Sequence, residues 1–269
     1  MNENKPKSGA KIIYFSHGGG PLPILNEPSH LKMNEFMAKL PDILKRPEAI
    51  IVFSAHWEES HVALQTNPAP PMLYDYFGFP AESYEIQYPA KNSPVFLDKV
   101  KKLLNDSNIA YTEDTTRGYD HGHFIPLKMM YPDADIPTFQ ISLLHSLDAK
   151  QHIELGKALH SLKSENILVI GSGFSFHNLR AFGFGESEID TRNDAFQNWL
   201  IETCTGDLPQ AEIEKRLVEW ESAPYARYCH PREDHLLPLH VCAGIAQSKA
   251  KLIFDDYIAG KRAVAFLWK

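Results

Sequence analysis

The chain of 269 residues has few cysteines and no long hydrophobic run. Its three cysteines show no paired spacing, so neither a disulfide framework nor a zinc ribbon is expected, and a reducing compartment suits the chain. No stretch approaches the roughly 18 apolar residues that a membrane helix needs. The first ten residues lack the apolar core of a secretory signal. We therefore expect a cytoplasmic protein in which residues 1–10 form a disordered tail.

Excess basic charge and several common catalytic motifs are also absent. The 27 Lys and Arg residues against 34 Asp and Glu residues give a net charge of −7, without a basic run. This balance argues against a nucleic-acid partner and against an anionic membrane. There is no GxSxG elbow, and the segment GSGFSFHN lacks the lysine of a P-loop. What stands out instead is histidine, of which the chain has 13.

Four short, continuously apolar runs predict buried strands, and amphipathic patterns between them predict helices. The strand runs are residues 11–16 (KIIYFS), 49–54 (AIIVFS), 138–143 (TFQISL) and 167–170 (ILVI). The helical patterns are residues 29–40, 93–104, 149–162, 193–203, 210–220 and 235–247. The tail alternates about Ala259-Gly260 like a β-hairpin. We expect one α/β domain over residues 11–269, with a mostly parallel or mixed central sheet, helices on both faces and a C-terminal hairpin.

Three of the four predicted strands deliver a histidine near their carboxyl ends. His17 follows the first run directly, His56 follows the second by one residue, and His177 lies a short loop beyond the fourth. Ligand sites in α/β sheets gather at that edge. A lone histidine is more often a structural residue, but three from separate strands suggest a metal site, because neutral imidazole is a common metal ligand.

Other histidines have readings that the residues alone leave open. His235, at a predicted helix start, is either a fourth member of the cluster or a structural residue, and the carboxylates Glu233 and Asp234 beside it could compete for a ligand role. We expect no chemistry from the remainder: His230 is expected to face solvent or cap a loop, His240 to be half-buried, and His152 and His160 to lie on a surface helix.

The segment RGYDHGHFIPL at residues 117–127 is dense in unusual chemistry. Asp120 beside His121 is suited to fix a histidine tautomer. His121 and His123 would share one side of an extended segment, which allows an HxH metal pair or a loop held by side-chain hydrogen bonds. We favour substrate contact for His121 and a structural role for His123.

Taken together, these motifs resemble the class III extradiol ring-cleaving dioxygenases, specifically the DOPA 4,5-dioxygenase-like branch of the LigB superfamily. The resemblance spans most of the chain in family order. It rests on residues 16–25 (SHGGGPLPIL), 53–59 (FSAHWEE), 118–143 (GYDHGHFIPLKMMYPDADIPTFQISL), 171–179 (GSGFSFHNL) and, more weakly, 230–240 (HPREDHLLPLH). The segment YDYFGFP at residues 74–80 also resembles the substrate-side loop of the family.

The resemblance implies one divalent metal per chain, held by His17, His56 and His235. It implies that His177 is the acid–base residue beside the metal or a fourth ligand, and that His121 lines the pocket near the substrate oxygen atoms. Many class III enzymes use two histidines and one carboxylate, the set associated with Fe(II). Because the third ligand implied here is a histidine, the shell suits Fe(II) for activity and also Zn(II).

The expected reaction is the opening of a catechol-type ring by O2 to a muconic semialdehyde. The alternatives are a zinc-dependent hydrolase with His177 as base, and a non-enzymatic metal-binding relative. The sequence does not choose between DOPA, protocatechuate and a larger catechol, and a homodimer is compatible with it. Residues suited to substrate binding are Asp120 and Tyr225, with other pocket candidates at Tyr74, Tyr76, Phe77 and Arg180.

Overall fold

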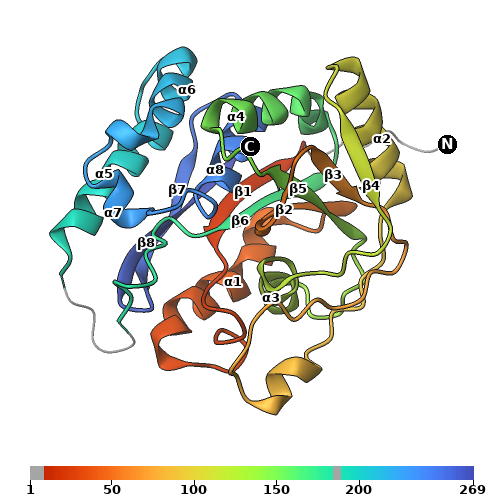
Figure 1. Cartoon of the computed structure of the whole chain (residues 1–269), viewed down its shortest axis with the longest axis horizontal. Helices are drawn as coiled ribbons and strands as arrows, with labels where there is room; N and C mark the ends of the chain where they lie inside the picture. Colours follow the sequence, from red (N-terminus) through yellow and green to blue (C-terminus); the bar gives the residue numbers. More distant parts are fainter. Residues whose placement is uncertain (1–8, 184–188) are drawn as a thin grey trace.

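The computed structural model describes residues 9–183 and 189–269, and its centre is a single eight-stranded sheet (Figure 1). The strand order is β4-β3-β5-β2-β6-β1-β8-β7. The strands are β1 (Lys11–Ser16), β2 (Ala49–Glu59), β3 (Val62–Gln65), β4 (Tyr111–Asp114), β5 (Thr138–Leu144), β6 (Ile167–Gly173), β7 (Lys251–Ile258) and β8 (Lys261–Trp268).

The middle of the sheet is parallel and its flanks are mixed. β5, β2, β6 and β1 run parallel to one another, and they include the four runs predicted from apolar sequence. β8 pairs antiparallel with β1 and with β7, forming the predicted hairpin about Ala259-Gly260, where both residues have positive φ. Because the four central strands are parallel, their carboxyl ends meet at one edge of the sheet.

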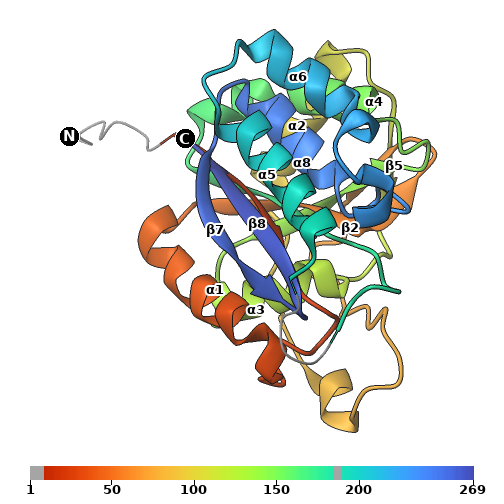
Figure 2. The same cartoon turned by 90° about the vertical axis from the view of Figure 1, so that its left-hand side faces the viewer.

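Helices cover both faces of the sheet, as Figures 1 and 2 show. α1 and α3 pack together on one side, and α4 and α8 pack together on the other. α6 packs against α4 and α8, and α5 packs against β7 and β8. α8 is buried along its whole length, which explains why its sequence is apolar on every side. The helices are α1 (Leu31–Leu44), α2 (Pro94–Asp106), α3 (His121–Met130), α4 (Ala149–Ala158), α5 (Thr191–Thr205), α6 (Gln210–Val218), α7 (Ala226–Cys229) and α8 (Leu237–Ala246).

The expected fold class is confirmed, and one local expectation is wrong. The segment from His121 onward is not extended: it is the helix α3, and the carboxylate of Asp120 caps its first turn by accepting from the His123 N–H. An Asp directly before the first helical residue is a typical N-cap. His121 and His123 therefore do not share a side as a pair on a strand would.

Three further expectations concern the tail, the membrane and the cysteines. Residues 1–8 of the expected disordered tail lie outside the described residues, while Ala10 donates its N–H to the Lys163 carbonyl. No helix in the described part of the chain has the length and apolar character needed to cross a lipid bilayer. Cys204, Cys229 and Cys242 are buried and free, as expected from their spacing.

Candidate metal centre

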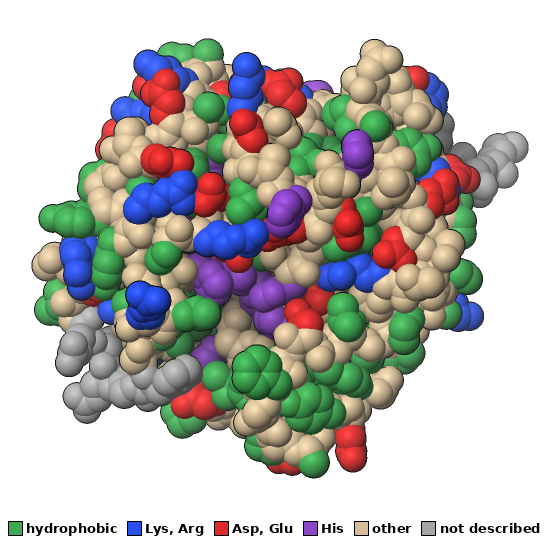
Figure 3. Space-filling view, viewed as in Figure 1, with side chains coloured by type: hydrophobic (Ala, Val, Ile, Leu, Met, Phe, Trp, Pro, Cys, Tyr) green, Lys and Arg blue, Asp and Glu red, His purple; other side chains and the backbone are tan. Residues whose placement is uncertain are grey.

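Six histidines line one cavity of about 520 Å³ at the carboxyl edge of the sheet. Five of them form a cluster of imidazoles from distant parts of the chain: His17, His56, His121, His177 and His235. The sixth, His30, accepts from the Gly19 N–H through Nε2. In the space-filling view the imidazoles of the cluster form a purple patch in a hollow bordered by green hydrophobic side chains (Figure 3). The gathering of His17, His56 and His177 at this edge follows from the strands that precede them.

His17 and His56 face each other in this cavity through their Nε2 atoms. His17 follows β1 and is buried, while His56 lies within β2 after its central part. Their Nε2 atoms are 3.0 Å apart. The Ser172 hydroxyl donates to the carbonyl of Gly122, so it accepts from His17 Nδ1–H at 3.0 Å. This arrangement leaves the lone pair of His17 Nε2 directed at the space it shares with His56.

His235 closes the third side of this space. Its ring centroid lies 5.2 Å from that of His17 and 4.9 Å from that of His56. Gly173 at the end of β6 allows this approach, because a Cβ there would lie only 2.1 Å from the His235 carbonyl oxygen. The backbone N–H of Phe174 donates to the same carbonyl, which fixes the start of this histidine segment against the sheet.

His177 stacks on His235, and one carboxylate lies beside both rings. The two ring centroids are 3.3 Å apart at an interplanar angle of 16°. Asp234 places its carboxylate oxygens 3.2 Å from His235 Nδ1 and 3.8 Å from His177 Nδ1. Although burial opposes ionisation, these two histidines hold the pKa of Asp234 well below its ordinary value. The carboxylate is therefore ionised near neutral pH.

His121 occupies the side of the cavity beside His56, with ring centroids 3.9 Å apart. Asp75 accepts from both the His121 backbone N–H at 3.0 Å and His121 Nδ1 at 2.8 Å. Burial opposes the ionisation of Asp75, but its contacts with His121 lower its pKa to about 2. The ionised carboxylate holds the Nδ1–H tautomer of His121, so Nε2 carries the lone pair.

Asp120 does not perform the role expected for it. It is fully buried and accepts from Ser54, Arg117 and Gln140, so it does not fix the His121 tautomer. It is not among the residues that line the cavity, and neither is Tyr225, whose residue surface is 55% exposed. Substrate binding by these two residues stays a prediction, and their positions give it no support.

The donor atoms form two groups, with no residue in common, that could each hold an ion. The ligand atoms of His17, His56 and His121 lie within 4.8 Å of one another, and so do those of His177, Asp234 and His235. His17 and His56 were expected as ligands, but the first group contains His121 where the sequence implied His235. The ligand set stays a prediction with two candidates for the third position.

Burial and crowding keep the central imidazoles neutral. Desolvation, followed by repulsion from neighbouring histidines, holds the pKa values of His17 and His235 well below the ordinary value. The same causes, burial first and His121 second, lower the pKa of His56 to about 3. Neutral imidazole is the form that binds a metal ion, so the cluster is ready to bind one at neutral pH.

Several other histidines are structural, and three expectations about their burial are wrong. His230, expected to face solvent or cap a loop, and His152, expected on a surface helix, are fully buried. His240, expected to be half-buried, is fully buried as well. His230 Nε2 bonds the Ser175 carbonyl, and His152 Nε2 accepts from the Leu144 N–H. His123, expected to be structural, is buried and stacks on Tyr119.

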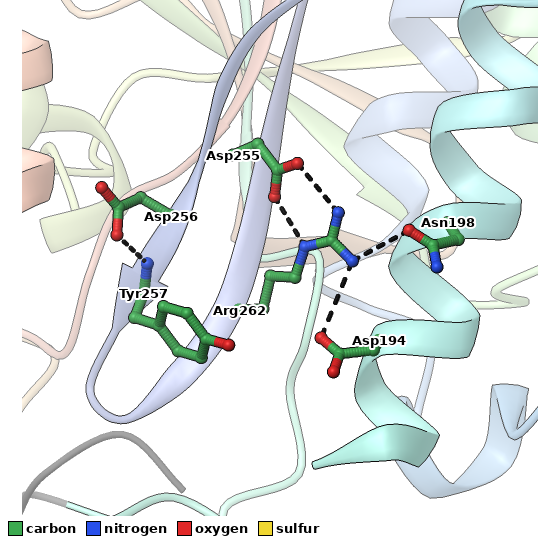
Figure 4. Close-up of a pocket in the computed structure, with 6 residues that line it drawn as sticks. All are labelled: Asp194, Asn198, Asp255, Asp256, Tyr257 and Arg262. Atoms are coloured by element: carbon green, nitrogen blue, oxygen red, sulfur yellow. Dashed lines mark hydrogen bonds and ion pairs between the residues drawn. The ribbon is translucent and has the colours of Figure 1, made fainter. Parts of the chain in front are cut away.

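A second hollow of similar size lies between α5 and the β7–β8 hairpin (Figure 4). Its one cation, Arg262, donates to both carboxylate oxygens of Asp255, at 2.6 and 2.8 Å, and to Asn198 at 2.9 Å. Since this guanidinium is already held by its neighbours, it is not available to a ligand. We assign the chemistry to the histidine cavity.

The sequence did not predict Asp75 and Ser172 as hydrogen-bond partners of the histidines. It also did not predict that Asp234 lies beside two histidine rings. Asp75 lies between Tyr74 and Tyr76 in the segment that resembles a substrate-side loop. A carboxylate between two aromatic residues in such a loop was the sequence feature that could have indicated a role for Asp75 in the site. Ser172, within GSG at the end of a predicted strand, could have been inferred from its position next to the sheet edge.

Comparisons with known proteins identify the family of the chain. Residues 13–266 match the family described as "Catalytic LigB subunit of aromatic ring-opening dioxygenase". "Dioxygenase tasH" of Hapsidospora irregularis is 36% identical, covering 96% of this chain and 85% of that protein. "4,5-DOPA dioxygenase extradiol" of Beta vulgaris is 35% identical over 93% of both chains. The crystal structure of an uncharacterized protein from Escherichia coli K12 aligns with a TM-score of 0.76 at 27% identity, covering 96% and 99% of the two chains.

The α/β fold with a histidine cluster at its carboxyl edge is thus that of an aromatic ring-opening dioxygenase, and the chain belongs to the LigB family. Within that family it falls in the DOPA dioxygenase-like branch, to which several relatives at 32–36% identity over most of the chain point.

Proposed function

We propose that this protein is a metal-dependent extradiol dioxygenase that uses Fe(II) and O2 to cleave a catechol-type ring to a muconic semialdehyde. The observation that carries the proposal is the convergence of His17, His56 and His235 about one point, with ring centroids 4.9–5.2 Å apart. The names of the relatives support the reaction class.

The donor set fits a divalent ion. Two imidazole nitrogens bound to one ion at 2.0–2.1 Å lie roughly 3–3.4 Å apart, and the Nε2 atoms of His17 and His56 are separated by 3.0 Å. His17 presents a lone pair because Ser172 fixes its tautomer. Both candidates for the third position, His235 and His121, lie within ring-contact distance of these two residues.

When bound, Fe(II) would supply a Lewis acid for the diol and an electron path between the ring and O2. The chain supplies the proton chemistry. His177 lines the cavity beside His235, and Asp234 lies 3.8 Å from its Nδ1, so it is placed to take a proton from a substrate hydroxyl. His121, whose Nδ1–H is held by Asp75, offers Nε2 as an acceptor for the other hydroxyl.

The test is anaerobic loading of metal-free protein with Fe(II), followed by a set of catechols and O2. Ring cleavage should give O2 uptake and a yellow semialdehyde absorbance. The matched control is zinc-loaded protein, which should bind catechols but take up no O2, because zinc has no accessible second oxidation state. Absence of O2 uptake with every catechol tested in the iron-loaded protein would overturn the proposal.

Metal content of single variants assigns the ligands. His17→Ala and His56→Ala should each lose the metal, and His177→Ala should keep it while losing turnover. Comparing His235→Ala with His121→Ala decides the third position, since only the true ligand should lose the metal. Metal loss in His177→Ala would instead make that residue a ligand.

An all-imidazole shell is also compatible with a zinc hydrolase, in which His177 would serve as base. This second candidate predicts ester or amide hydrolysis by zinc-loaded protein. Hydrolysis that depends on zinc and on His177, without O2 uptake by the iron-loaded form, would favour it.

A further inference from the structure

The cavity above the histidines has two apolar walls. One apolar wall comes from the loop before α2, through Tyr76, Phe77 and Phe79. A second apolar wall comes from the segment after β6, through Phe174, Leu179 and Phe182. The volume of about 520 Å³ lies within the range of roughly 300–1,000 Å³ that holds drug-sized ligands. It provides more space than a single dihydroxybenzene ring needs.

No lysine or arginine lines this cavity among the described residues. The charged side chain that does line it is a carboxylate, Asp234, and a second carboxylate, Asp75, lies behind His121. An anionic group on the substrate would lose its water without gaining a cationic partner. Arg232 is held by both oxygens of Glu58, so it is not free to enter the cavity.

Two large apolar side chains line the cavity and yet are mostly exposed to solvent. Phe77 is 90% exposed and Leu179 is 74% exposed, and each comes from a different one of the two apolar walls. Gly78, with a φ of +78°, turns the backbone directly after Phe77. Exposed apolar side chains that border a cavity mark a surface that an apolar ligand can cover.

We propose that the preferred substrate is an uncharged catechol with an apolar substituent or fused ring. The diol lies at the histidines, and the apolar part extends outward between Phe77 and Leu179. This inference rests on the proposed ring-cleaving function and adds a substrate class to it. A carboxylated catechol such as protocatechuate, or a zwitterionic one such as DOPA, is a poor substrate because its charged group meets apolar walls and carboxylates.

The experiment compares tert-butylcatechol, unsubstituted catechol, protocatechuate and DOPA. Binding is measured by calorimetry on zinc-loaded protein, and kcat/KM on iron-loaded protein. We expect tert-butylcatechol to bind at least tenfold more tightly than protocatechuate or DOPA, and to show a higher kcat/KM. Phe77→Ala and Leu179→Ala should weaken binding of tert-butylcatechol by several fold while changing that of unsubstituted catechol little.

Val95→Ala is the matched control, because Val95 is an exposed apolar residue that does not line the cavity. Tighter binding of protocatechuate or DOPA than of tert-butylcatechol would overturn the proposal. If the Arg180→Gln variant no longer bound the charged catechols more tightly, the neighbouring hollow that Arg180 lines would be the site that binds their carboxylate.

Failure of the proposed function would give a different result, because the iron-loaded protein would then cleave no catechol. The order of catechol affinities for the zinc-loaded protein would still show whether the cavity prefers an apolar ligand.

Discussion

Gly122 gives a sharp test of how the helix α3 positions the metal site. A Cβ at this residue would lie 2.5 Å from Ser54 Oγ and 3.1 Å from His56 Cδ2. Ser54 Oγ makes the tighter contact, so it must shift against its 2.7 Å hydrogen bond to Asp120, and His56 must give by a few tenths of an ångström. Overpacking of this kind costs about 1–3 kcal/mol in total. Because bound metal would hold His56 against the clash, metal binding should weaken, and the whole energy falling on His56 would correspond to about 5- to 150-fold.

The measurement for Gly122→Ala is zinc or Fe(II) affinity by competition with a coloured chelator, together with thermal unfolding of the metal-free protein. Gly183→Ala is the matched control, since a Cβ there meets no atom of the described residues within 4 Å, its chain neighbours aside. We expect the control to match the wild-type affinity. A folded Gly122→Ala protein that binds metal as tightly as the wild type would show that His56 is either not strained by this contact or not a ligand.

Three further predictions follow from individual contacts. Asp75→Ala removes the acceptor of two His121 hydrogen bonds, so steady-state kinetics should show kcat/KM lowered by about 10- to 150-fold, equivalent to roughly 1.5–3 kcal/mol, with metal content unchanged. Asp75→Asn, which keeps an acceptor, should lose less. Gly156→Ala places a Cβ 2.3 Å from a backbone carbonyl of α8 and should lower the melting temperature in calorimetry. Burial opposes the ionisation of Asp190, but its hydrogen bond to Lys261 lowers its pKa. The free energy of unfolding of the wild type, measured by urea titration, should therefore decrease as the pH is lowered from about 4. The free energy of unfolding of Asp190→Asn should change less over the same pH range.

The sheet and most helices could be predicted because their signals are local. An apolar run such as residues 11–16 is a strand in any context that buries both faces, and Pro94 opens α2 where the sequence placed it. The segment after Asp120 was misread because its composition, with two histidines and a proline, gives little helical periodicity. Its helix is stabilised by the Asp120 cap and by complete burial of its first turn.

The cluster of histidines could be predicted as far as topology dictates it. Because parallel strands end at a common edge, residues that follow them must meet, which brings His17 and His56 together. Which partner fixes each ring is a question of tertiary contact, and no periodicity encodes it. Asp75 lies 46 positions before His121 along the chain, so sequence proximity wrongly favoured Asp120.

The contacts and charges around the cluster distinguish these histidines, which suit a divalent ion, from histidines that only form structural hydrogen bonds in the core. Structural histidines of this chain, such as His152 and His230, bond backbone groups through their rings. The rings of the cluster instead face one another, and two ionised carboxylates, Asp75 and Asp234, stand behind them on the Nδ1 sides. Asp234 is also paired with Arg232 at 3.1 Å, whereas the ion-pair partners of Asp75 in the described part of the chain are His56 and His121. A divalent cation at the centre of the rings would add positive charge beside Asp75 and give the crowded lone pairs a common partner.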